Sequence, residues 1–376
     1  MAAKQTDQGY RQQQLLSRRV FLKMGAAGGT ALAAHLMGLN LARARTGAQR
    51  SRVVWVEHGR AALGWSADYA GRVDARAAQE MLDRAITRLA GETTVSDAWA
   101  RLFGAHNGGE GYQPGQKIAV KLNFNNTHVD IQHNPNLPVV LALLRQLVDQ
   151  VGISQAHIVL YDSSRLIPDQ FRQGIAARYP QVALNPPSAE SFRADMGLTR
   201  LTALLDETSY LINMPLLRTH SGAGLSLSFK NHVGSVETPG STHDDLARTD
   251  PGQNSLVRVN SHPLIAHKTL LVVADGIYGL RERGPSEDPG GQYGLTDPFP
   301  NSLFVSTDPV AVDSVMADYL QNRGANFNVP WDARMYMSAA AAIGLGNHET
   351  RLDYQYQTID LVTCRGESCW GENGLP

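Results

Sequence analysis

Polar side chains that could do chemistry stand where short apolar runs of this sequence end. Lys121 and Asn123 close the first of these runs, Asp162 follows the second, Asn213 ends the third and Asp275 closes a later one. Asp and Asn also favour turns and helix caps, which explains some of these positions without any function. Lysine has no such preference. We therefore expect part of this set to hold a ligand.

The stretch from residue 213 to residue 245 holds the densest group of reactive side chains. Its polar members are Arg218, Thr219, His220, Lys230, Asn231, His232, His243, Asp244 and Asp245. Interleaved glycines let the backbone approach a ligand closely. Long glycine-rich polar segments inside a compact domain are usually functional or disordered, and the apolar LSLSF within this one favours order.

Three cations come from different segments of the sequence: Lys121, Arg218 and Lys230. Cations that converge in this way hold a carboxylate, a phosphate or an acidic sugar. The alternative is that each cation pairs with a local carboxylate, the candidates being Asp162, Asp275 and Asp308. On the sequence alone the two interpretations have equal weight.

Several histidines accompany these groups: His220, His232, His243, His262 and His267, with His128 and His133 beside Asp130 as a second group. Imidazole and carboxylate together suit zinc, iron, nickel or manganese. We predict Asp162, His220 and Asp275 as ligands if a divalent metal is bound. No pair has the four-residue helical spacing of a zinc motif, so the alternative is that each histidine is an ordinary hydrogen-bonded residue.

The predicted roles divide the candidates into two further groups. The catalytic set is His220, as general acid–base, with Lys230 and Lys121. The substrate-binding set is Asn123, Asn213, Arg218, Thr219, Asn231 and Asp308. Asp308 can equally cap a helix that has Pro309 in its first turn, with Asp313 facing away from the site. Ser163, Ser164 and Ser221 lack the Gly-x-Ser-x-Gly elbow of a serine hydrolase, and no dinucleotide-binding glycine motif follows a strand.

The elements that must position these residues are short apolar strands alternating with helices. The expected strands are 117–122, 157–161, 210–214, 269–275, 302–306 and 357–363, and the clearest helical patterns are 138–152 and 310–320. This order predicts an α/β fold with a mostly parallel sheet flanked by helices. A long polar loop region rich in Gly and His follows the third strand. Ligands of such sheets bind outside the carboxyl ends of the strands.

An ordered set of motifs resembles the family catalogued as domain of unknown function 362, over roughly residues 115–345. The motifs are KLN (121–123), DSS (162–164), INMPLLRTH (212–220), SFKN (228–231), ADGI (274–277) and STDPVAVD (306–313). The resemblance implies a fold and a site but no reaction. Where family members usually have Lys-Thr-His, this chain has Arg218, whose planar fork suits a carboxylate or phosphate and cannot form a Schiff base.

Many members of that family also carry ferredoxin-like cysteine clusters. This chain has only Cys364 and Cys369, so we expect no iron–sulfur cluster. The two cysteines are close enough in sequence to form a disulfide in an oxidising compartment.

The N-terminal segment resembles a twin-arginine export signal. Ser17-Arg18-Arg19-Val20-Phe21-Leu22-Lys23 precedes a charge-free stretch, 24–42, and Ala42-Arg43-Ala44 offers a cleavage site. We predict a signal peptide at 1–44 and a single α/β domain at 45–376, with a short strand and a cysteine-containing tail at 357–376. A retained membrane anchor is the alternative to cleavage.

Charge excludes two classes of partner. The whole chain has a formal net charge of −1, and residues 1–44 contain six Lys or Arg and one Asp, so the remainder is near −6. An acidic protein has no electrostatic reason to bind nucleic acid or anionic lipid. We therefore predict a periplasmic enzyme, exported by the twin-arginine machinery, that acts on a small anionic substrate with or without a divalent metal. The alternative is a non-catalytic binding or maturation protein for an anionic ligand, a metal or a partner peptide.

Overall fold

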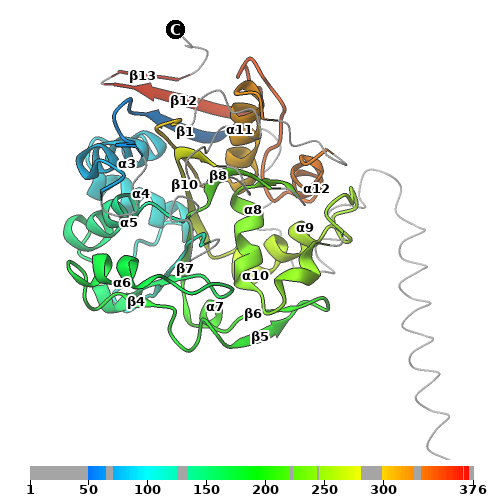
Figure 1. Ribbon diagram of the computed structural model, residues 1–376, viewed down its shortest axis with the longest axis horizontal. Coiled ribbons are helices and arrows are strands. Elements are labelled where there is room, and N and C mark those ends of the chain that lie inside the picture. The colour runs from blue at the N-terminus through cyan, green and yellow to red at the C-terminus, as the bar shows by residue number, and fades with distance from the viewer. Residues whose placement is uncertain are drawn as a thin grey trace, which may run out of the picture. The chain divides into compact units, whose positions relative to one another are not determined.

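Helices cover both faces of one large mixed sheet in the computed structural model (Figure 1). The structure describes residues 50–64, 71–124, 134–220, 223–243, 245–280, 299–325, 332–366 and 368–371. The chain divides into two units, residues 1–45 and 46–376, and all described residues belong to the second. The α/β fold expected from the sequence is confirmed.

The main sheet has eleven strands. Nine of them follow one another in the order β13 (Ser368–Trp370), β12 (Ile359–Arg365), β1 (Ser51–Glu57), β11 (Ser302–Ser306), β10 (Thr269–Leu280), β7 (Tyr210–Asn213), β2 (Ile118–Lys121), β3 (Ile158–Tyr161) and β4 (Ala183–Leu184). β8 (Leu216–His220) also pairs with β10, and β9 (Gly224–Ser226) forms a hairpin with β8. From β10 to β4 every pairing is parallel.

β11 runs against its neighbours. It is antiparallel to both β10 and β1, whereas β1 is parallel to β12. β11 therefore begins level with the later part of β10, where Ser302 pairs with Gly276, and ends level with Val272. We use the name carboxyl edge for the side of the sheet at which the parallel strands end. The amino edge is the opposite side. β11 ends toward the amino edge.

The central strands β2, β3 and β7 are buried over their whole length. Parallel strands that are covered by helices on both faces read as nearly continuous apolar runs, which is why the sequence identified them. One face of the sheet carries α3 (Ala75–Ala90), α4 (Val95–His106), α5 (Leu137–Leu144) and α6 (Asp169–Ala176) (Figure 1). The other carries α8 (Ser228–Asn231), α9 (Ser255–Ser261), α10 (Pro263–Ala266), α11 (Pro309–Asn322) and α12 (Met335–Ala342).

Local signals define the longer helices. The Asp74 side chain accepts a hydrogen bond from the Ala77 amide at the start of α3, and Gly91 ends this helix at φ 73°. Asp308 caps α11 by accepting from the amides of Val310 and Ala311, as its sequence predicts. α5 continues as a π-helical turn, η3 (Arg145–Gln150). The remaining short elements are α7 (Leu204–Glu207), the hairpin of β5 (Phe192–Asp195) and β6 (Arg200–Thr202), and three 3-10 turns, η4 (Gln155–His157), η5 (His232–Ser235) and η6 (Pro239–Thr242).

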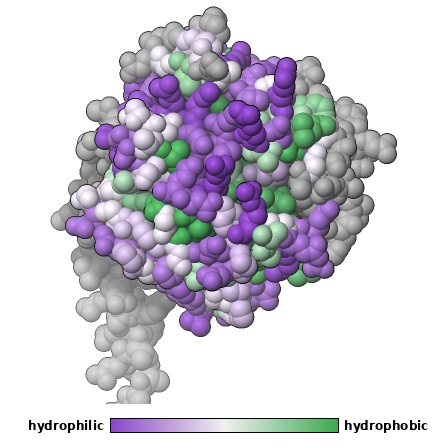
Figure 2. Space-filling model, turned by 90° about the vertical axis from the view of Figure 1, so that its left-hand side faces the viewer, coloured by the Kyte–Doolittle hydropathy of each residue, from purple (hydrophilic) through white to green (hydrophobic). Residues whose placement is uncertain are grey.

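The apolar core lies on both sides of the sheet. One cluster joins the sheet to α3, α4, α5 and α6, and two others join it to the helices of the opposite face. Figure 2 shows the surface on the α3–α6 side, which is mostly hydrophilic, with hydrophobic residues in small separate groups. No helix among the described residues combines the length and apolar character needed to cross a bilayer.

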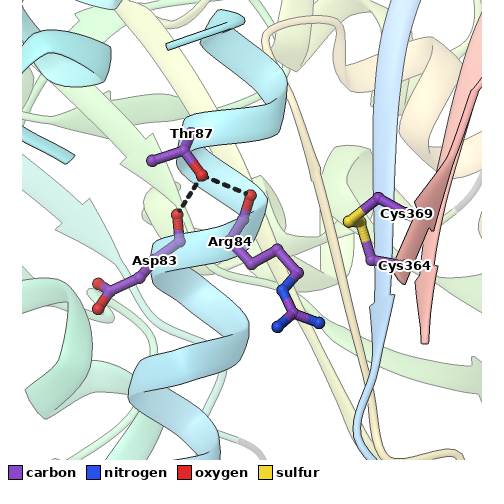
Figure 3. Close-up of a disulfide and its surroundings, with 5 residues drawn as sticks. All are labelled: Asp83, Arg84, Thr87, Cys364 and Cys369. Carbon is purple, nitrogen blue, oxygen red and sulfur yellow. Dashed lines mark hydrogen bonds between the residues drawn. A yellow bond between two sulfur atoms is a disulfide. The ribbon is translucent and has the colours of Figure 1, made fainter. Parts of the chain in front are cut away.

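Cys364 and Cys369 form a disulfide across the hairpin of β12 and β13, as the sequence predicts (Figure 3). The two residues stand directly opposite each other in the antiparallel pair. Cys364 is fully buried in the core cluster that contains residues of α3. Within α3, the Thr87 hydroxyl donates to the backbone carbonyls of Asp83 and Arg84.

Candidate functional site

A buried ion pair lies at the carboxyl edge, where β2 and β3 end. Lys121 Nζ is 3.3 Å from Asp162 Oδ2, and the two side chains are 1% and 3% exposed. The Lys121 ammonium also donates to the Leu122 carbonyl and to Asn231 Oδ1, so each of its three N–H groups has an acceptor. Burial lowers the pKa of Lys121, and the Asp162 carboxylate opposes that shift.

Asp162 is held by several donors besides the lysine. Its carboxylate accepts from the Phe124 amide at 3.0 Å and from both the amide and the hydroxyl of Ser164. These are the contacts of a satisfied buried charge. Lys121 and Asp162 therefore follow the alternative interpretation, in which a cation pairs with a local carboxylate.

Two asparagines join this pair to α8. Asn231 Nδ2 donates to Asn213 Oδ1 at 2.6 Å, and Asn213 Nδ2 donates to the Ser228 carbonyl at 2.9 Å. We call Lys121, Asp162, Asn213 and Asn231 the buried polar network. It brings together four predicted site residues from β2, β3, β7 and α8.

The segment that follows α8 closes over the network. A Cβ atom at Gly234 would lie 2.5 Å from Lys121 Nζ and 2.7 Å from Asp162 Oδ1, so only glycine fits there. His232 Nδ1 lies 3.3 Å from Ser235 Oγ, which also bonds the Tyr161 hydroxyl. Burial, and then the Lys121 charge, lower the pKa of His232 to about 3. His232 is therefore neutral at physiological pH.

A second group of side chains, which we call the Lys–His cluster, contains His220, Lys230 and His243. His243 Nδ1 lies 2.9 Å from the Pro239 carbonyl and must donate to it, since a carbonyl only accepts. His243 Nε2 then carries the lone pair, which accepts from Lys230 Nζ at 3.1 Å. His220 Nδ1 accepts from the Ala223 amide at 3.0 Å, so its ring proton is on Nε2. The two imidazole rings are 5.7 Å apart between centroids.

The Lys–His cluster is less enclosed than the buried polar network. His220 and His243 are half-buried, whereas Lys230 is 7% exposed. Lys230 and Asn231 are neighbours on α8, so this one short helix contributes to both groups. The arrangement offers an ammonium, an imidazole N–H and a proton-sharing Lys–His pair, which suit binding of an anion and proton transfer to or from it.

The predicted metal ligands are not brought together. Asp275 bonds the backbone and side-chain amides of Asn136 at the start of α5, whereas the buried polar network contacts α8 on the opposite face (Figure 1). Burial raises the pKa of Asp275, although the Asn136 donors act against it. Within the ranges that the structure describes, no group of three or more His, Cys, Asp or Glu side chains could hold a metal ion.

Asp308 lies away from the other predicted substrate-binding residues. Because β11 is antiparallel, its end and Asp308 lie toward the amino edge. There the carboxylate caps α11 and accepts from the Ser51 hydroxyl and the Asn347 amide. The expectation that placed Asp308 at the ligand-binding edge assumed a parallel strand.

Asp313 faces inward, contrary to expectation. Its fully buried carboxylate accepts from the amides of Ser228 and Phe229, at 2.8 and 3.1 Å, and from the Tyr336 hydroxyl at 2.9 Å. Neither this role nor the contact of Gly234 with Lys121 and Asp162 was predicted from the sequence. Asp313 is 85 residues from Ser228, and no local pattern joins them.

Other predicted residues are close to the same edge. Arg218 and Thr219 are buried in β8, and Asn123 is buried just after β2. Thr219 Oγ1 and Ser163 Oγ are buried atoms with no hydrogen-bond partner among the described residues. His128, Asp130, His133, Ser221 and Asp244 lie outside the described residues, as does the predicted signal.

Of the comparisons with known proteins, the match to a family model agrees with the resemblance seen in the motifs. Comparison with curated proteins gives no match. The chain is similar to a crystal structure of a Thermotoga maritima protein from a structural genomics programme, with 12% identity and a TM-score of 0.28. The match covers 56% of this chain and 51% of that one, about half its length. A family model described as "Domain of unknown function (DUF362)" matches residues 118–318, more than half of the sequence, and the chain belongs to that family.

Proposed function

We propose that this protein is an enzyme that acts on a small anionic substrate at the carboxyl edge of its sheet. The observation that carries the proposal is the Lys–His cluster, in which an ammonium and two imidazoles with defined tautomers meet. Parallel α/β sheets bind their ligands at this edge. The hydroxyls of Ser163 and Thr219, which have no partner within the described ranges, also suit a polar ligand, because buried hydroxyls normally have a partner.

We assign the roles of these residues differently from the roles expected on the sequence alone. Lys230 supplies positive charge, and His220 donates to a substrate oxygen through Nε2–H. Because Lys230 and His243 share a hydrogen bond, a proton can pass between them, and the pair can give it to the substrate or take one up. Lys121 and Asp162 neutralise each other, so their role is to hold β2, β3 and α8 together beneath this cluster.

The proposal is tested by anion binding and turnover in purified protein. Replacing the charged donor, Lys230→Met, should weaken binding of inorganic phosphate at least tenfold in calorimetry, since a charge-assisted hydrogen bond contributes about 1.5–3 kcal/mol. Lys117→Met is the matched control. Lys117 lies just before β2, is 43% exposed and pairs with Glu207. Equal binding by wild type and Lys230→Met would contradict the proposal.

Catalysis requires a further measurement. His220→Ala should abolish turnover of phosphate esters or carboxylates while leaving the melting temperature of the free protein unchanged within a few degrees. A ligand that stabilises the protein without being consumed would favour the alternative function, a non-catalytic binding protein. Elemental analysis of natively exported protein tests the predicted divalent metal separately.

We also propose that the chain is exported by the twin-arginine route to the periplasm and that residues 1–44 are its signal. The disulfide between Cys364 and Cys369 supports this, because disulfides form and persist in oxidising compartments.

A further inference from the structure

α8 is a short helix whose start is held by a residue from elsewhere in the fold. It has only four residues, Ser228–Asn231, yet it carries Lys230 of the Lys–His cluster and Asn231 of the buried polar network. A helix of this length does not hold its shape alone. Contacts with other elements must therefore fix the position of Lys230.

Those contacts converge on the first turn of α8. The Asp313 carboxylate accepts from the Ser228 and Phe229 amides, and the Ser228 hydroxyl donates to the Pro309 carbonyl at 3.0 Å. Asp313 and Pro309 both belong to α11, one turn apart. No side chain of α8 or of the residue before it caps this helix. α11 therefore supplies the acceptors that the helix start lacks.

We propose that Asp313 is a positioning residue for the site: by binding the first two amides of α8, it sets where Lys230 stands relative to His243. The inference rests on the proposed function, because it assigns Asp313 a part in anion binding at that site. Asp313 touches no site side chain itself and acts only through α8.

The groups that face Asp313 explain why its charge is retained. Tyr336 on α12 donates to the same oxygen as Phe229. The charge of Arg334, just before α12, opposes the rise in the pKa of Tyr336 that burial causes. Burial raises the pKa of Asp313 to about 6, and its donors from Ser228, Phe229 and Tyr336 oppose that rise. At neutral pH the carboxylate is ionised and can accept all three hydrogen bonds.

The test compares two buried carboxylates on α11. Asp313→Asn keeps the volume of the side chain but puts an NH2 group against donors, so at least one amide or hydroxyl loses its acceptor. Asp318→Asn is the matched control. Asp318 is equally buried and has three partners, Arg334, the Arg351 amide and Tyr356, none of them on α8.

Two readouts separate positioning from general stability. The first is the 15N chemical shift of His243 Nε2, which should move when the Lys230 ammonium no longer donates to it. The second is the affinity for inorganic phosphate. We expect Asp313→Asn to change the His243 signal and to weaken phosphate binding at least tenfold, with Asp318→Asn matching wild type in both.

Each other outcome overturns the inference. Wild-type readouts in folded Asp313→Asn contradict it, and so do equal changes in the two variants. If Asp313→Asn does not fold, Tyr336→Phe, which removes one donor and keeps the carboxylate, should itself move the His243 signal away from its wild-type position. An unchanged signal there is again contrary. If wild type binds no phosphate, the proposed function fails while the His243 signal still tests Asp313.

Discussion

Lys121 and Asp162 show what a charged pair needs in a protein interior. Two ions removed from water are stabilised only if their attraction is supplemented by hydrogen bonds to the remaining donors and acceptors. Here the ammonium has three acceptors, and the carboxylate has donors from Phe124 and Ser164. Gly234 then excludes solvent from the pair by close backbone approach.

The approach of Gly234 gives a test of the buried polar network. Gly234→Ala would push a methyl group against Lys121 Nζ and Asp162 Oδ1, and we expect a loss of about 1–3 kcal/mol in the free energy of unfolding by urea. Gly240→Ala lies in the same segment, has nothing within 4 Å of its Cβ and should change stability by less than about 0.5 kcal/mol. Equal effects would show that the network tolerates displacement.

His232 makes a second residue-scale prediction, which concerns acid. Its pKa is lowered in the folded protein to about 3 from an ordinary value of 6.5, so its contribution to stability is present above pH 6.5 and is lost as pH falls from there toward 3. Between pH 7 and pH 5 this loss is about 2 kcal/mol.

The measurement is the unfolding free energy at each pH for wild type and His232→Gln. The difference in unfolding free energy between wild type and His232→Gln should shrink by about 2 kcal/mol from pH 7 to pH 5, because glutamine does not titrate. Parallel curves would contradict the prediction, because they would mean that His232 has the same pKa in the folded and unfolded states.

At the scale of elements, the β12–β13 hairpin depends on its disulfide. β13 has three residues and pairs only with β12 in the described sheet, at its edge. Replacing both cysteines by serine should cost about 2 kcal/mol of unfolding free energy, from the entropy of the short loop that the bond closes. Phosphate binding should not change, since four strands separate β12 from β2.

Reduction provides the control for that prediction. Dithiothreitol should lower the melting temperature of wild type to that of the double variant and leave the variant itself unchanged. A reductant effect on the variant would place the loss elsewhere.

At the scale of elements, strands were predictable from the sequence where both of their faces are buried. The apolar runs that became β2, β3, β7, β10 and β11 stand out because helices cover both of their faces. The polar block after residue 213 was expected to be a loop, but it contains the β8–β9 hairpin and α8. These elements are too short for periodicity to reveal them, and their stability comes from distant partners such as Asp313.

The proximity of residues at the ends of parallel strands was predictable from the sequence. Lys121, Asp162 and Asn213 lie together at these strand ends, and Asn231 joins them from α8. Asp308 and Asp275 do not join them, because strand direction and the face on which a side chain lies depend on how the chain connects. Neither property is encoded locally.

At the scale of the whole molecule, the redox state of the disulfide depends on the compartment in which the protein is found. If the twin-arginine pair directs export, Arg18→Lys with Arg19→Lys should leave the protein in the cytoplasm with Cys364 and Cys369 reduced. Fractionation followed by thiol alkylation would show both effects. Periplasmic, oxidised protein from the double variant would contradict the export proposal.

β1 lies between β11 and β12, its partners from more than 240 residues later in the sequence. β1 has neither neighbour until Ser302–Ser306 has been synthesised, and it gains β11 before β12. The sheet can close around it only after Ile359–Arg365 has been synthesised, so this half of the sheet is completed late. A chain released before that point would expose the apolar Val53–Val56 edge to other chains.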